Sequence, residues 1–136
     1  MTHAEAIASL KFKDEQHQSR FESLRGLYIS DPDGAPDPYR ESMAYLIALN
    51  DDTYRHRNEL YNIEEGCIIP DGLRAEWQTS TSLKVTRLAF NLFTAGSAWC
   101  PDDEMHLVTP DAIFDSNLAQ FFVEAIRLRM YPVFDD

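Results

Sequence analysis

The sequence has few of the residues that build disulfide frameworks, nucleic-acid surfaces or membrane spans. Only two of its 136 residues are cysteines, Cys67 and Cys100, so disulfides do not form a framework. The sequence has 12 basic and 23 acidic residues, and the resulting net charge of -11 argues against direct binding to nucleic acid or an anionic membrane. No apolar run reaches the roughly 18 residues that cross a bilayer, and the N-terminus does not have the pattern of a secretory leader. We therefore expect a cytoplasmic protein with reduced thiols.

The length and the apolar content fit one compact unit. With 44% apolar residues, the chain can bury roughly two-thirds of the surface that it exposes when unfolded, which suffices for one core without a structural metal. No repeat of 20–50 residues is visible. We expect a single α-helical domain over residues 1–136.

Helical spacing of apolar residues alternates with turns rich in proline, glycine and aspartate. The predicted helices cover residues 14–25, 38–49, 52–62, 81–93 and 117–130, with a short helical turn at 109–114. Residues 31–38 hold three prolines and a glycine and are predicted to be a loop. The apolar run at 67–69 is too short to predict a strand. The fold class is therefore all-α: an irregular bundle of about five principal helices, with short turns and little or no sheet.

The segment 81–93 has the most regular apolar pattern. Val85, Leu88, Ala89 and Leu92 repeat at helical spacing, and further apolar residues lie on the other faces. This pattern predicts the central, most buried helix. Gly96 is expected to end it in the left-handed conformation.

Several polar residues stand where helices begin. Asp37 precedes Pro38, and Asp115 with Ser116 precedes the last helix, so these side chains are expected to be N-caps. The hydroxyls at 79–82 precede the helix at 81–93 and serve either as caps or as an anion site. A phosphate loop is excluded, because the glycine-rich turn and its lysine are missing.

The acidic residues gather in intervals that contain no lysine or arginine. One lies between Arg25 and Arg40, another between Arg57 and Arg74, and the longest runs from Arg87 to Arg127. Solvation and capping explain many of these acids; the functional interpretation is a surface that docks on a basic partner, with a tryptophan as its anchor. The candidate partner-binding residues are Asp31, Asp33, Asp37, Trp99, Asp102, Asp103, Glu104 and Asp111.

Two other chemistries are weaker hypotheses. Asp102, Asp103, His106 and Asp111 could surround a divalent ion in an enzyme or small-ligand binder, whereas the loop at 31–42 fails the spacing of a calcium loop. We predict no cofactor and no resident metal.

The cysteines lack a zinc-ligand spacing, and no hydrolase, zinc-protease or dinucleotide motif occurs. Cys67, beside two isoleucines, is expected to be buried; Cys100, between Trp99 and Pro101, is expected to be exposed.

Scattered motifs carry a resemblance to a known family. They are Asn-Asp-Asp-x-Tyr-Arg at 50–55, Leu-Tyr at 60–61, Trp-Gln-Thr-Ser at 77–80, Lys-Val-Thr-Arg-Leu-Ala-Phe-Asn-Leu-Phe at 84–93, Thr-Pro at 109–110 and Glu-Ala-Ile-Arg-Leu-Arg at 124–129. In these the chain resembles a family of small uncharacterised acidic proteins from Gram-positive bacteria, their phages and mobile elements, which is classed as a domain of unknown function. The resemblance covers roughly residues 38–130 and brings no assigned activity.

The sequence thus favours a non-enzymatic, acidic protein-binding module. The resemblance to phage proteins implies an inhibitor or adaptor that acts on a nucleic-acid-handling or defence protein of the host. The alternatives are the metal-dependent enzyme or ligand binder described above, and a homodimeric scaffold.

Overall fold

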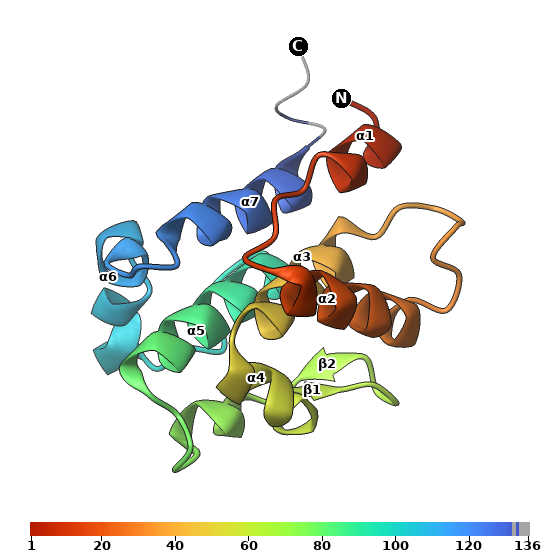
Figure 1. Ribbon diagram of the computed structural model, residues 1–136. Coiled ribbons are helices and arrows are strands. Elements are labelled where there is room, and N and C mark those ends of the chain that lie inside the picture. Colours follow the sequence, from red (N-terminus) through yellow and green to blue (C-terminus); the bar gives the residue numbers. More distant parts are fainter. Residues whose placement is uncertain (132, 134–136) are drawn as a thin grey trace.

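The computed structural model describes residues 1–131 and 133, and it is mostly helical (Figure 1). The α-helices are α1 (His3–Ala8), α2 (Glu15–Tyr28), α3 (Pro38–Leu49), α4 (Asp51–Arg55), α5 (Ser80–Thr94), α6 (Pro110–Phe114) and α7 (Ala119–Met130). Three 3-10 helices, η1 (Arg57–Glu59), η2 (Pro70–Arg74) and η3 (Asp102–Leu107), and the strands β1 (Tyr61–Asn62) and β2 (Cys67–Ile68) complete the fold. The all-α class is confirmed, and every described helix is too short or too polar to cross a bilayer.

Helix α3 lies at the centre of the molecule, where it packs against α2, α5 and α7 (Figure 1). Every residue from 41 to 49 is buried, because apolar or small side chains occupy all faces from 42 onward and the Glu41 carboxylate is paired with Arg25. The prediction that the helix at 81–93 is central was wrong. Helix α5 buries its stripe of Val85, Leu88, Ala89 and Leu92, but Leu83 and Phe93 on its other faces remain half-exposed.

The N-termini of α3, α5 and α7 show which of the predicted N-caps form. The Asp37 carboxylate accepts from the Arg40 N–H at 3.0 Å, so its N-cap role is confirmed. Thr79 caps α5 reciprocally with Ser82, which confirms the capping interpretation of the hydroxyls at 79–82. The prediction for Asp115 was wrong: it ends α6, and α7 begins only at Ala119 without a side-chain cap.

The predicted helix at 52–62 stops early and gives way to a hairpin. After α4 and η1, β1 pairs with β2 in antiparallel register, Tyr61 opposite Ile68 and Asn62 opposite Cys67. The turn is closed by the Gly66 N–H on the Asn62 carbonyl, at 2.8 Å. Gly66 has a φ of 67°, which glycine adopts without the penalty of other residues. The hairpin hydrogen bonds replace the helical ones that the apolar spacing suggested.

Three local predictions were reversed. Helix α5 extends through Thr94, so the left-handed residue after it is Ala95 (φ 58°) and not Gly96. Cys67 is exposed because it lies on the peripheral hairpin, and Cys100 is buried. Burial raises the pKa of the Cys100 thiol, which disfavours the reactive thiolate.

A buried histidine makes the stability of the fold depend on pH. The His17 ring packs against Tyr45, its Nδ1 accepts from the Lys13 N–H (3.1 Å), and its Nε2 donates to the Tyr45 carbonyl (2.9 Å). Burial lowers the pKa of His17, so the folded chain binds its proton more weakly than the unfolded chain does.

We expect the free energy of unfolding to be at its full value above about pH 6.5, the ordinary histidine pKa. The free energy of unfolding should fall as the pH drops below about 6.5 toward the lowered pKa of His17. In this range the unfolded chain binds the imidazole proton more tightly than the folded chain does, so protonation favours unfolding. Urea denaturation at about pH 7.5 and pH 5.5 measures this loss. His17→Gln should reduce it; an equal loss in wild type and variant would contradict the prediction.

Candidate functional site

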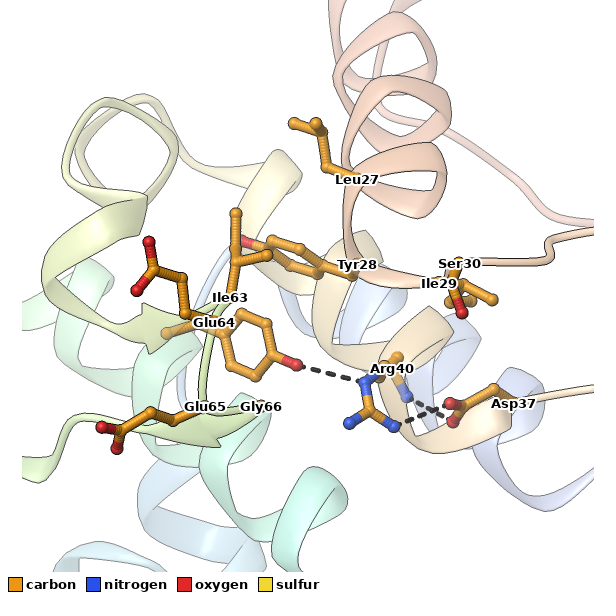
Figure 2. A pocket seen from close by; sticks show the side chains of 11 residues that line it. Leu27, Tyr28, Ile29, Ser30, Asp37, Arg40, Ile63, Glu64, Glu65 and Gly66 are labelled. Atoms are coloured by element: carbon orange, nitrogen blue, oxygen red, sulfur yellow. Dashed lines mark hydrogen bonds and ion pairs between the residues drawn. The ribbon is translucent and has the colours of Figure 1, made fainter.

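A surface cleft opens where the end of α2 meets the β1–β2 hairpin. Its volume is about 530 Å³, and Figure 2 shows the side chains around it. It is lined by Leu27, Tyr28, Ile29, Ser30, Asp37, Arg40, Tyr61, Ile63, Glu64, Glu65 and Gly66. We call this site the hairpin cleft.

Two aliphatic side chains stand exposed on the hairpin cleft. Leu27 is 55% exposed and Ile63 is 44% exposed. Leu27 is exposed because it lies off the buried stripe of α2, and Ile63 because it enters the hairpin turn. Figure 2 shows Leu27 on the α2 side and Ile63 on the hairpin side, with the Tyr28 ring near Ile63. The centroids of the Tyr28 and Tyr61 rings are 4.6 Å apart. The cleft therefore combines an aromatic floor with an aliphatic rim.

Arg40 is the basic residue of the cleft. Its Nε donates to the Tyr61 hydroxyl at 3.1 Å, and its Nη1 donates to the Asp37 carboxylate at 2.9 Å. These bonds, the one to Asp37 first, raise the pKa of Arg40, so the guanidinium stays charged. Nη2 points toward Gly66 (Figure 2), where an added Cβ would lie 3.1 Å from it. Among the described residues, Nη2 makes no hydrogen bond.

Three carboxylates line the hairpin cleft: Asp37, which pairs with Arg40, and Glu64 and Glu65. Glu64 and Glu65 occupy the hairpin turn, and in Figure 2 their side chains point outward, away from Arg40. On the other side, the 31–37 loop leaves the cleft next to Ser30 and returns at Asp37. Asp31 and Asp33 in this loop are exposed, but neither lines the cleft, and Asp33 lines a separate pocket beside α1. Glu64 and Glu65 are therefore the carboxylates of the cleft that no ion pair within the described chain compensates.

The remaining predicted acids form a second, separate surface. Asp102, Asp103 and Glu104 belong to η3, and Asp111 belongs to the first turn of α6; we call this the η3–α6 surface. Glu104 lies 3.6 Å from Arg74, whereas the three aspartates are exposed. Figure 1 shows the 31–37 loop (orange) and α6 (blue) on opposite sides of the molecule. The structure therefore does not bring the two predicted groups together.

Trp99 is less available than an interface anchor needs to be. The side chain is half-buried, and its ring packs edge-on against Phe90 at a centroid distance of 5.5 Å. Its Nε1 already donates to the Gly96 carbonyl at 3.0 Å. Packing against Phe90 and the hydrogen bond to Gly96 therefore hold the Trp99 side chain against the turn that follows α5.

The metal hypothesis lacks a suitable cluster. Across residues 1–131 and 133, no three histidine, cysteine, aspartate or glutamate side chains are grouped so that they could hold an ion. Asp102, Asp103, His106 and Asp111 thus do not converge on one point, and we do not pursue a metal-dependent activity.

Comparison with known proteins places the chain in a family. Residues 7–134 match the model of the Family of unknown function (DUF6075). The chain belongs to this family. The predicted resemblance to a domain of unknown function is thereby confirmed over most of the sequence. Neither the curated proteins nor the solved structures contain a match to this DUF6075 chain.

Sequence reasoning found one residue of the hairpin cleft and missed the rest. Of the predicted site residues, Asp37 lines the cleft and Asp31 and Asp33 do not. Leu27 and Ile63 were not predicted, since no sequence signal shows that they are exposed. A usable signal did exist for Glu64 and Glu65, because both fall in the base-free interval between Arg57 and Arg74. What the sequence could not show is that the DUF6075 fold places this interval across a cleft from the end of α2.

The floor of the cleft contains an unusual hydroxyl. The Tyr28 Oη is buried and makes no hydrogen bond within the described chain. Burial also raises the pKa of Tyr28, so the hydroxyl is protonated at any physiological pH. An unsatisfied buried hydroxyl destabilises the folded state.

We expect Tyr28→Phe to raise the free energy of unfolding by about 1 kcal/mol, because it removes a polar group that has lost its water. The matched control is Tyr61→Phe, which deletes the acceptor of the Arg40 Nε bond and should lower it by a similar amount. Urea denaturation of both variants is the measurement. A loss of stability in Tyr28→Phe would mean that the hydroxyl does have a partner.

Proposed function

We propose that this protein is a non-enzymatic, acidic protein-binding module that docks on a basic partner through the hairpin cleft. The observation that carries the proposal is the pair of exposed aliphatic side chains, Leu27 and Ile63, on a cleft that is also lined by Glu64 and Glu65. Protein interfaces commonly have an apolar centre that is desolvated on binding and a polar rim around it. Unpaired carboxylates in such a rim select a positively charged partner and speed its approach.

The charge of the whole chain favours the same class of partner. A net charge of -11 repels phosphates and anionic lipids, and it steers basic surfaces toward the protein. By size scaling a chain of this length has a radius of gyration of about 14 Å and is about 36 Å across. Duplex DNA of that length carries about 20 phosphate charges. The protein therefore offers about half the charge density of a nucleic acid.

Proteins that handle nucleic acids expose basic grooves that fit such an acidic surface. The proposal therefore extends to an inhibitor or adaptor that occupies a groove of this kind on a nucleic-acid-handling or defence protein of the host. The resemblance to proteins of phages and mobile elements supports this choice, because such elements gain from blocking host proteins of that class.

The test is affinity capture from a lysate of the native host, with wild type and variants immobilised in parallel. Leu27→Ser combined with Ile63→Ser should abolish retention of the partner, and Glu64→Lys combined with Glu65→Lys should weaken it strongly. Val123→Ser, at a residue 51% exposed on α7, and Glu15→Lys on α2 are the matched controls and should retain it. Raising the salt from about 50 to about 300 mM should release the partner, because the screening length falls to about 6 Å.

Equal retention by wild type and by the Leu27 and Ile63 variant would contradict the proposal. Loss of retention only in Asp102→Lys combined with Asp103→Lys would move the docking site to the η3–α6 surface and would also overturn it.

A further inference from the structure

We infer that α1 is a strap that opens as a unit while the rest of the fold stays closed. Its hinge lies at residues 9–10, and its latch is the His3 ring on the Glu41 carboxylate. The inference goes beyond the proposed function, because none of the residues 3–8 is among those that line the hairpin cleft. It is drawn from the firm attachment of the chain after the hinge, the weak attachment of α1 before it, and two cavities beside α1.

The chain is firmly attached from Lys11 onward. The Lys11 N–H donates to the Glu124 carboxylate at 2.9 Å, and the Lys11 carbonyl accepts from the Tyr45 hydroxyl at 2.6 Å. The Lys13 N–H donates to Nδ1 of His17 at 3.1 Å. Glu124, Tyr45 and His17 belong to α7, α3 and α2 and are all buried, so breaking these bonds would leave buried polar groups unsatisfied. This segment therefore stays in place as long as the three helices are packed together.

Helix α1 itself is attached weakly. It packs against α7 at the edge of the molecule (Figure 1), and of its six residues Ala6 is buried and Ile7 is half-buried. A helix this short is not stable on its own, and ordering it costs conformational entropy at every residue. The small apolar surface that these two side chains bury offsets little of that cost. The closed position of α1 therefore depends on its latch.

The latch is polar, and it can open without leaving a charge unpaired. Nε2 of His3 lies 2.7 and 3.0 Å from the two carboxylate oxygens of Glu41. That carboxylate is 0% exposed, and Nε of Arg25 donates to it from α2 at 2.7 Å. When His3 leaves, Glu41 keeps Arg25 as its counter-ion, and water can take the place of the imidazole. Opening the latch is therefore much less costly than removing the arginine would be.

Two cavities beside α1 reduce the packing that holds it. One, of about 500 Å³, lies between α1 and α2 and has Phe12 and Phe21 in its wall. The other, of about 340 Å³, lies between α1 and the loop that precedes α3. Ile7, Ala8 and Arg25 line both cavities, so the two are neighbours along α1. Side chains next to such spaces lose dispersion contacts, and opening of α1 would join the cavities and give water access to the aromatic wall.

The experiment is hydrogen–deuterium exchange of the full chain, followed by NMR, in wild type and in Leu46→Ala. The amides at 6–10 bond within α1 and the turn that ends it, whereas those at 43–49 lie in α3. The substitution destabilises the closed and the open strap equally, so exchange at 6–10 should keep its wild-type rate. Exchange at 43–49 should become about thirtyfold faster or more. The amides of Lys11 and Lys13 should follow α3, because they lie beyond the hinge. Equal acceleration at 6–10 and at 43–49 would overturn the inference.

A second variant tests the latch. His3→Ala should make exchange at 6–10 about tenfold faster, since it removes a hydrogen bond to a buried carboxylate. The matched control is His56→Ala, which removes an exposed 2.7 Å contact with Glu59 and should leave exchange at 6–10 unchanged. An unchanged rate in His3→Ala would overturn the latch. Protection that rises steadily from residue 6 to residue 10, in place of one common opening, would show fraying of the chain end and would overturn the strap.

Discussion

Replacing Arg25 with methionine is expected to lower the free energy of unfolding by about 3–5 kcal/mol. Its Nε donates to the Glu41 carboxylate at 2.7 Å, and that carboxylate lies 0% exposed in α3. The other neighbour of the carboxylate is His3, whose Nε2 lies 2.7 Å from Oε1. Removal of Arg25 leaves a buried charge without its permanent counter-ion, which costs far more than the loss of a surface ion pair.

Two comparison variants isolate this effect. Arg25→Met combined with Glu41→Met should recover most of the lost stability, because a buried ion pair can be exchanged for apolar side chains of similar size. Arg74→Met breaks the exposed 3.6 Å pair with Glu104 and should change the free energy of unfolding by less than about 0.5 kcal/mol. If Arg25→Met behaved like Arg74→Met, the Glu41 carboxylate could not be buried as the structure has it.

Leu46→Ala should lower the free energy of unfolding by about 2–5 kcal/mol. Leu46 is 0% exposed on α3, where α2, α5 and α7 converge, so the truncation leaves a cavity that these helices cannot close independently. The same substitution at Leu27 should cost less than about 0.5 kcal/mol, since that side chain is 55% exposed. Chemical denaturation of the two variants compares a core leucine with a cleft leucine.

A small effect of Leu46→Ala would contradict the central position of α3. A large effect of Leu27→Ala would show that Leu27 belongs to the core, and its exposure could then not serve binding.

Local signals in the sequence predicted local structure well. Asp37 followed by Pro38 marked the start of α3, and the structure begins that helix at the same residue. The hydroxyls before α5 acted as caps, as expected. These features depend on a few neighbouring residues, which is why the sequence alone sufficed for them.

Features that depend on distant contacts were not predicted. The apolar pattern was most regular in α5, yet the packing of α2, α5 and α7 around α3 decides which helix is enclosed. The short α1 was missed altogether; Thr2 and Glu5 cap it reciprocally, and the contact of His3 with Glu41 ties it to α3. The Thr2–Glu5 cap is a local signal that the sequence did offer, whereas the packing around α3 and the His3–Glu41 contact depend on residues far apart in the chain.

The candidate site shows the same limit. Charge patterning picked out the acids at 31–37 and at 102–111, but the fold places these groups on opposite sides of the molecule. The aliphatic rim of the hairpin cleft, Leu27 and Ile63, was not predicted, because one residue comes from α2 and the other from a hairpin of two-residue strands. Strands this short leave almost no period-two pattern in a sequence.

The most direct test of the account is hydrogen–deuterium exchange of the protein, alone and with its purified partner. Docking at the hairpin cleft should slow exchange at residues 27–40 and 61–66, and leave exchange at 102–114 unchanged. Protection confined to 102–114, or no protection at 61–66 in a saturated complex, would contradict the central claim that the partner sits between the end of α2 and the hairpin.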